Sequence, residues 1–132
     1  GSEPSVPGLS ARALRRALCV RRWDFVKIDI EGGERRVFEG DTGWLASARY
    51  VFVETHDDMV GGSHTAVVRA LKSAGLSIVG VQLDHETVVL ACRDDGGAHC
   101  RHVCQQWSSV TKGKSVWCTG AAPRGHLGRT TG

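Results

Sequence analysis

Residues 24–34 read Asp24-Phe-Val-Lys-Ile-Asp-Ile-Glu-Gly-Gly-Glu34, and this stretch predicts a buried strand that ends in a glycine turn. Its apolar residues form the nearly continuous run typical of a strand covered on both faces of a parallel sheet: Phe25, Val26, Ile28 and Ile30. Three charged residues recur with period two and therefore share one side of the strand: Lys27, Asp29 and Glu31. Gly32 and Gly33 then end the strand, because glycine adopts backbone angles that other residues avoid.

The acids of this strand lie where an α/β sheet binds its ligands. In an open parallel sheet, ligands bind beyond the carboxyl ends of the strands, so Asp29 and Glu31 are candidate site residues. A purely structural interpretation fits the same spacing. In that interpretation Lys27 pairs with Asp29, and Glu31 caps the following helix, since acids favour the first turn.

A second strand presents polar residues at the same end of the predicted sheet. Residues 50–56, Tyr-Val-Phe-Val-Glu-Thr-His, are strongly β-forming by residue type. Alternation puts Glu54 and His56 on one side, both at the carboxyl end. We therefore expect these two side chains to lie at the same end of the sheet as Asp29 and Glu31.

The remaining elements alternate between helices and strands. Ser10 fits the N-cap of a short helix that ends near Val20. The order after the first strand is a short helix at 34–39, the strand at 50–56, a helix at 64–74, and strands at 76–83 and 87–93. The three residues between the last two strands permit only an antiparallel hairpin. The predicted fold class is α/β, a mostly parallel sheet with an antiparallel last hairpin.

The character of the chain changes after Arg93. The 132 residues make one domain at most, and we assign residues 1–93 to the sheet. Residues 94–132 have repeated glycines and no sustained period, which predicts an irregular tail that contains Gly and Cys. The first residue is not Met, so Gly1-Ser2 fits either a tag remnant or a chain cut from a longer product.

The net charge of +3 is unevenly distributed. Residues 1–23 carry +4, residues 24–93 carry −4 and residues 94–132 carry +3. The N-terminal arginines fit the solvated side of a helix rather than a basic surface interleaved with aromatic residues, so we expect no nucleic-acid partner. No apolar run approaches the ~18 residues of a membrane span, and we expect no such span in this chain.

Five cysteines are an odd number for a disulfide framework. They favour a reduced, intracellular chain, and hence a cytoplasmic one. A zinc site in the tail is an alternative, because Cys100-x₃-Cys104 has a spacing found in structural zinc sites. Further soft ligands lie nearby in the sequence: Cys92, His99, His102 and Cys118. No second clean pair follows, so we expect unpaired cysteines and no metal.

The two strands together carry the pattern Asp24-x-x-Lys27-x-Asp29-x-Glu31-Gly32-x-Glu34, and the second closes on Glu54-x-His56. Over residues 20–93 this resembles the carboxyl-terminal half of FkbM-family methyltransferases. The resemblance implies the Rossmann-like sheet of class I methyltransferases, in which seven strands bind S-adenosyl-L-methionine across their carboxyl edge. Residues 24–30 would be its fourth strand, 50–55 its fifth, and the hairpin its sixth and seventh.

The resemblance also implies a reaction and its residues. The family that this sequence resembles methylates hydroxyl groups of sugars and secondary metabolites, so the resemblance implies a small-molecule or sugar hydroxyl as the partner. Asp29 and Glu31 would border the methyl donor and the acceptor, with Glu54 and His56 beside them. The acceptor must lose a proton, and Asp29, Glu31 and His56 are candidate bases that the sequence does not rank.

The chain departs from this family pattern in its first part. A complete domain has a strand that runs into a glycine-rich turn and an acid about 20 residues later. This sequence contains no Gly-x-Gly and has no room for three strands before Asp24. We therefore expect a fragment that lacks most of the cofactor site, does not turn over alone, and aggregates through its exposed sheet edge.

Two other classes of function fit parts of the sequence. Asp-x-Glu at a strand end also suits a pair of glycosidase carboxylates, but a barrel hydrolase needs about 250 residues. A non-catalytic remnant, or a module that binds zinc or a partner through the Cys/His tail, is the alternative to the enzyme.

Overall fold

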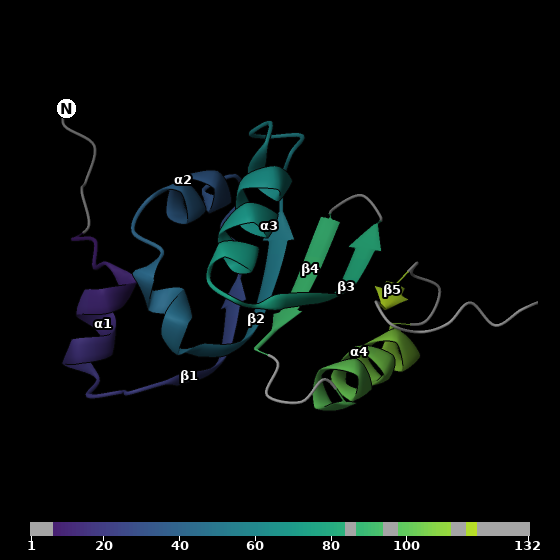
Figure 1. The fold of residues 1–132 in the computed structure, drawn as a ribbon. Helices are drawn as coiled ribbons and strands as arrows, with labels where there is room; N and C mark the ends of the chain where they lie inside the picture. Colours follow the sequence, from purple (N-terminus) through teal and green to yellow (C-terminus); the bar gives the residue numbers. More distant parts are fainter. Residues whose placement is uncertain (1–6, 84–86, 94–97, 112–115, 119–132) are drawn as a thin grey trace, which may run out of the picture.

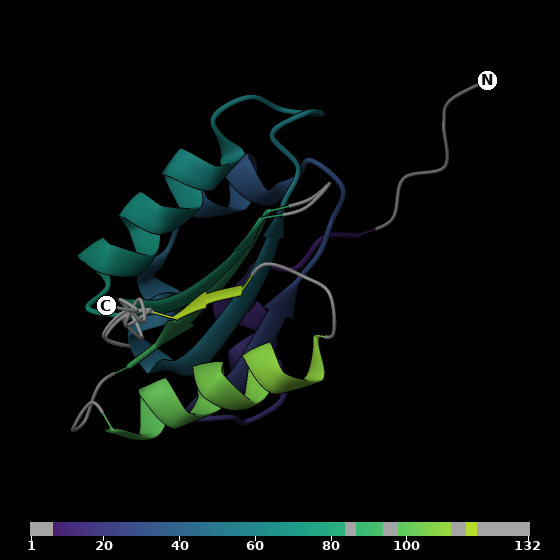
Figure 2. The same ribbon diagram turned by 90° about the vertical axis from the view of Figure 1, so that its right-hand side faces the viewer.

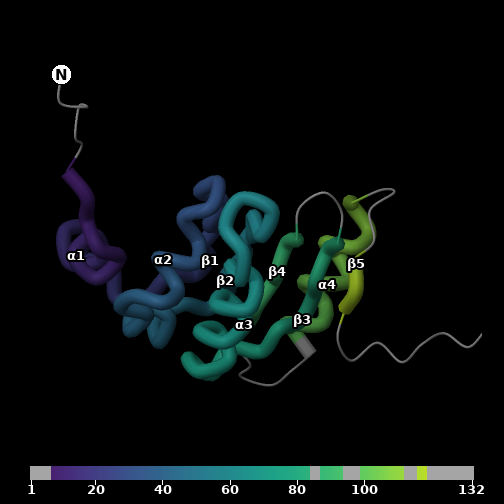
Figure 3. Tube along the Cα trace, turned by 90° about the horizontal axis from the view of Figure 1, so that it is seen from above, coloured from purple at the N-terminus to yellow at the C-terminus, as the bar shows by residue number. Residues whose placement is uncertain are grey.

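Alternating apolar residues build the sheet at the centre of the fold. The computed structural model describes residues 7–83, 87–93, 98–111 and 116–118. Its described strands are β1 (Trp23–Ile28), β2 (Ala48–Thr55), β3 (Ser77–Leu83), β4 (Thr87–Cys92) and β5 (Val116–Cys118). They form a five-stranded sheet in the order β1-β2-β4-β3-β5, which can be followed from one side to the other in Figure 3.

The directions of the strands correct one prediction. β1 and β2 are parallel, whereas β4 is antiparallel to both β2 and β3, and β5 is antiparallel to β3. The antiparallel hairpin of β3 and β4 is confirmed. The prediction of a mostly parallel sheet is wrong for the described neighbours, because β4 inserts between β2 and β3 and turns two of the contacts antiparallel. The mixed α/β class is confirmed.

Two short helices and a longer one surround the first part of the sheet. α1 (Ala11–Ala17) begins after Ser10, whose hydroxyl accepts a hydrogen bond from the amide of Ala13 at 3.1 Å, as predicted. α2 (Glu34–Glu39) and α3 (Ser63–Ser73) cover one face of the sheet (Figures 1 and 2), and the 3₁₀ helix η1 (Gly43–Ser47) precedes β2. A core forms beneath α3, and its fully buried members include Leu45, Val51, Val53, Val67, Leu71 and Val89.

The segment after Arg93 is more regular than the sequence analysis predicts. α4 (Ala98–Val110) covers the face of the sheet opposite α3 (Figure 2), and β5 extends the sheet beyond β3. The expectation of an irregular tail is therefore wrong for these two elements. α4 closes a second core whose buried members are Val79, Leu90, Cys92, Cys100 and Cys104. Residues 119–132 lie outside the described part of the chain.

Two disulfides fasten α4 to the sheet. Cys92 of β4 is bonded to Cys100, and Cys104 is bonded to Cys118 of β5, with Cα atoms 5.8 and 5.9 Å apart. Cys19 is free and exposed. The prediction of a reduced chain with unpaired cysteines is therefore wrong for four of them. The pairing also removes the thiolates from the zinc alternative, because Cys100 and Cys104 are bonded to different partners.

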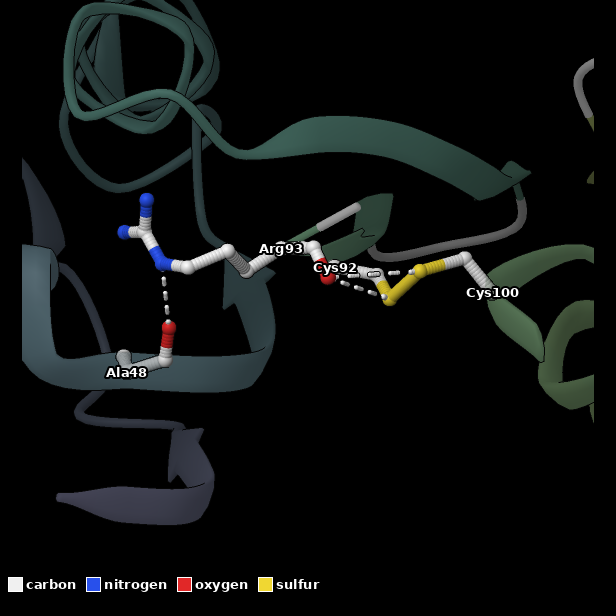
Figure 4. Close-up of a disulfide and its surroundings, with 4 residues drawn as sticks. All are labelled: Ala48, Cys92, Arg93 and Cys100. Atoms are coloured by element: carbon white, nitrogen blue, oxygen red, sulfur yellow. Dashed lines mark hydrogen bonds between the residues drawn. A yellow bond between two sulfur atoms is a disulfide. The ribbon is translucent and has the colours of Figure 1, made fainter. Parts of the chain in front are cut away.

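Figure 4 shows the first disulfide at the end of β4, next to Arg93. The Arg93 side chain donates from Nε to the carbonyl of Ala48 at 3.1 Å and from Nη2 to that of Leu45 at 2.8 Å. This residue thus connects the end of β4 to the start of β2. None of the helices within the described residues has the length and the apolar character needed to cross a bilayer.

Candidate functional site

The parallel register of β1 and β2 brings their carboxyl ends together. Ile28 is paired with Val53, so the next residues lie side by side: Asp29 directly after β1, and Glu54 in the last part of β2. The carboxylates of these two residues and the imidazole of His56 offer ligand atoms that all lie within 4.8 Å of one another. The sequence predicts that four candidates lie together at this end of the sheet, and the structure brings three of them together, all except Glu31.

His56 is held from one side by a carboxylate that the sequence analysis does not select. The residue is 6% exposed, and its Nδ1 lies 3.0 Å from Oε1 of Glu34. On the other side of the ring, Nε2 lies 3.9 Å from Oδ1 of Asp29, which is longer than a direct hydrogen bond. The imidazole therefore lies between one fully buried acid and one partly exposed acid.

Glu34 is completely buried and yet charged. Its carboxylate accepts backbone hydrogen bonds from Ile30 and Gly32, each at 3.2 Å. Burial by itself raises the pKa of Glu34, but these amides, its own amide and His56 outweigh that cost and lower the pKa below its ordinary value of 4.5. An ionised carboxylate can only accept a hydrogen bond, so Nδ1 of His56 carries the hydrogen and donates the hydrogen bond to Glu34.

The backbone of the turn creates the pocket of amides around Glu34. Glu31 and Gly32 have φ angles of +49° and +95°, in the left-handed region, and this reversal directs the amides of the turn at the carboxylate. The positive φ favours glycine at this position, and a Cβ on Gly32 would also make a tight contact of 3.2 Å with the side chain of Val60. Gly32 has the unusual backbone angle that the sequence predicts, but the strand ends earlier, at Ile28, and Gly33 has an ordinary φ of −80°.

Glu31 is not part of the cluster. β1 ends at Ile28, so the side chains of Asp29 and Glu31 do not follow a strand's alternation as predicted. Glu31 is exposed in the turn. Glu31 does not cap α2 either. The N-cap residue of this helix is Gly33, and no side chain forms a capping hydrogen bond there. The other half of the structural interpretation is confirmed, since Nζ of Lys27 lies 3.2 Å from Oδ2 of Asp29.

The ion pair with Lys27 occupies only one oxygen of Asp29. Oδ2 meets the ammonium group, while Oδ1 is the atom that faces Nε2 of His56. The side chain of Asp29 is 36% exposed, and Glu54 is partly buried. The site therefore opens to solvent beside Asp29 and is closed beneath by Glu34.

A protein-family model matches this chain. The model of the methyltransferase FkbM domain matches residues 12–78, just over half of the 132 residues, and the matched part contains both strand ends and every member of the cluster. The searches of curated proteins and of solved structures each return no significant match. The chain belongs to the FkbM methyltransferase domain family.

Proposed function

We propose that this chain contributes the reacting end of an S-adenosyl-L-methionine-dependent O-methyltransferase that acts on a hydroxyl group of a sugar or another small molecule. The observation that supports this proposal is the convergence of Asp29, Glu54 and His56 at the carboxyl ends of two parallel strands in a methyltransferase family chain. Carboxyl ends of parallel strands are where open α/β sheets bind their ligands.

Methyl transfer to a hydroxyl makes two demands on a protein. The acceptor oxygen must be aligned with the methyl group, and the hydroxyl must lose its proton as the new C–O bond forms and the S–C bond breaks. The three clustered side chains promote that loss. Glu34 orients His56 for this task, because its hydrogen bond to Nδ1 leaves Nε2 directed at Asp29 and the open side of the site.

The residues present fit one end of the cofactor. When bound, S-adenosyl-L-methionine supplies an electrophilic methyl group on a positively charged sulfur. The carboxylates of Asp29 and Glu54 give the open side of the cluster a negative potential that favours such a cation. The glycine-rich turn that would hold the rest of the cofactor is not found in this sequence, which contains no Gly-x-Gly. We therefore propose that the chain alone does not turn over.

The Rossmann-like assignment is part of the same proposal. In a class I sheet, β1 would be the fourth strand and β2 the fifth. β3 would be the sixth strand, and β4, which is antiparallel and lies between β2 and β3, would be the seventh. β1 then borders the cofactor-binding strands, which would be supplied by residues outside this chain.

The test uses the longest open reading frame that contains residues 1–132. Its product is incubated with S-adenosyl-L-methionine labelled in the methyl group and with a panel of sugars and hydroxylated metabolites. We expect label in at least one acceptor, and a loss of about 100-fold or more in kcat/KM for Asp29→Asn and His56→Ala. The exposed residues Asp58 and His102 provide matched controls, Asp58→Asn and His102→Ala, that keep the wild-type rate. Wild-type rates in both site variants would end the proposal.

A further inference from the structure

We propose that Asp29, Glu54 and His56 bind a divalent cation of the Mg²⁺ and Mn²⁺ class, and that this cation holds the acceptor hydroxyl. The ligand atoms of the three residues lie within 4.8 Å of one another, a separation that a single ion can bridge with small side-chain adjustments. Two carboxylates and one imidazole suit Mn²⁺, which accepts oxygen and nitrogen ligands and keeps further positions open for water or substrate.

The surroundings of His56 support a metal ligand rather than a buried structural histidine. Metal-binding histidines commonly donate their second ring N–H to a carboxylate, which fixes the tautomer and the direction of the free nitrogen. Glu34 takes this role at 3.0 Å, and it is fully buried and itself fixed by two backbone amides. Glu34 is not one of the three proposed ligands, so the orientation that it imposes on His56 supports a metal site in addition to the proximity of the ligands.

The gap between His56 and Asp29 also fits an ion. Their facing atoms, Nε2 and Oδ1, are 3.9 Å apart, too far for a direct hydrogen bond but suitable for two ligands on one metal. Oδ2 of the same carboxylate is already engaged by Lys27, so Oδ1 is the oxygen available to a cation.

The charges of the site point in the same direction. Asp29, Glu34 and Glu54 bring three negative charges around His56, and the ammonium group of Lys27 offsets one of them. With a neutral imidazole, these groups carry −2, which a divalent cation balances. A coordinated hydroxyl becomes more acidic, so its proton is released to water as the C–O bond forms and the S–C bond of the donor breaks. This role rests on the proposed methyl transfer, whereas the binding of the ion does not.

The first experiment measures binding of Mn²⁺ alone to the purified chain, by the loss of the electron paramagnetic resonance signal of free Mn²⁺. We expect one binding site for Mn²⁺. The affinity should fall in Asp29→Asn and in Glu54→Gln, and each loss should exceed the ~10-fold to 100-fold that is typical when a residue that only orients a metal ligand is removed. Asp58→Asn and Glu39→Gln change exposed acids that do not belong to the cluster, and these variants should bind as the wild type does.

A second measurement needs no variant. Bound Mn²⁺ should broaden the ring resonances of His56 selectively, while those of exposed His99 and His102 stay sharp. Binding that is absent, equal in all variants, or unaccompanied by broadening of His56 would overturn the proposal. Metal binding without methyl transfer would reject the proposed function and leave the site standing. Methyl transfer that persists undiminished in a strong chelator, with no Mn²⁺ bound, would reject the site alone.

Discussion

Glu34 shows how a single buried charge can organise a site. It accepts hydrogen bonds from the turn and from His56, so one side chain fixes both the backbone after β1 and the imidazole after β2. Glu34 is part of the sequence motif, but Glu31 is the residue predicted for the site. The alternation of a strand puts Glu31 on the same side as Asp29, and the sequence does not reveal that the backbone reverses direction at Gly32. The role of Glu34 depends on a partner 22 residues away, which no local pattern reveals.

The first prediction concerns the stability that Glu34 contributes. The variant Glu34→Gln keeps the shape but loses the charge, so the turn amides and His56 lose a strong acceptor. We expect the free energy of unfolding to fall by about 1–3 kcal/mol at pH 7. Equilibrium denaturation monitored by circular dichroism measures it, with Glu39→Gln, on the exposed end of α2, as the matched control. A loss no larger than that of the control would contradict the account.

The second prediction concerns pH. The pKa of Glu34 is lower in the folded chain than its ordinary value of 4.5, so the folded state holds the ionised form more tightly than the unfolded state does. This stability is fully present above pH 4.5 and is lost as the pH falls through the lower, folded pKa. Unfolding measured between pH 7 and pH 3 should therefore show a steeper acid loss in the wild type than in Glu34→Gln. Parallel curves would be inconsistent with the lowered pKa.

At the scale of the elements, local signals predict more than long-range ones. The hairpin and the cap at Ser10 each follow from a few neighbouring residues, and both are confirmed. α4 is missed for a physical reason. Its inward residues recur at helical spacing, namely Cys100, Val103, Cys104 and Trp107, but the cysteines become apolar core residues only through partners on β4 and β5.

The third prediction tests how closely α4 packs on β3. A Cβ at Gly80 would lie 2.5 Å from Sγ of Cys104 and 3.0 Å from the ring of Trp107. Gly80→Ala should therefore destabilise the fold by about 1–3 kcal/mol through overpacking. Gly61 has no atom within 4 Å of an added Cβ, so Gly61→Ala serves as the control in the same thermal unfolding experiment. Equal midpoints would show that α4 does not approach β3 in this way.

The fourth prediction concerns the disulfides. Peptide mapping without reductant should recover Cys92 linked to Cys100, Cys104 linked to Cys118, and Cys19 as a free thiol. Closing the loop between Cys104 and Cys118 restricts the unfolded chain, so Cys104→Ser with Cys118→Ser should lower stability by about 3 kcal/mol. Cys19→Ser is the control, because this exposed cysteine is unpaired. Three or more free thiols in the folded chain would refute the pairing.

For the whole molecule, the free side of β1 is the feature with the largest consequence. β1 ends the described sheet, and an open apolar groove of about 570 Å³ lies along it, lined by residues that include Leu14, Trp23, Phe25, Ile28 and Ile30. Phe25 is 59% exposed. An unpaired strand beside apolar surface favours association with other chains, which agrees with a sheet that is continued by further strands in the proposed enzyme.

The fifth prediction follows from this edge. The isolated chain should associate as its concentration rises, as measured by size-exclusion chromatography with light scattering, and Phe25→Lys should reduce the association. Val110, at the end of α4, is also exposed and apolar, so Val110→Lys is the control that leaves association unchanged. A monodisperse wild-type monomer at all concentrations would contradict the prediction of an aggregating edge.

The central claim is that methyl transfer takes place at the carboxyl ends of β1 and β2. The most direct test is hydrogen exchange of the longest reading-frame product, followed by mass spectrometry with and without S-adenosyl-L-methionine. The account predicts that the cofactor slows exchange in peptides that span residues 29–34 and 54–56, and leaves α4 unchanged. Protection confined to other parts of the chain, with none at these two strand ends, would contradict it.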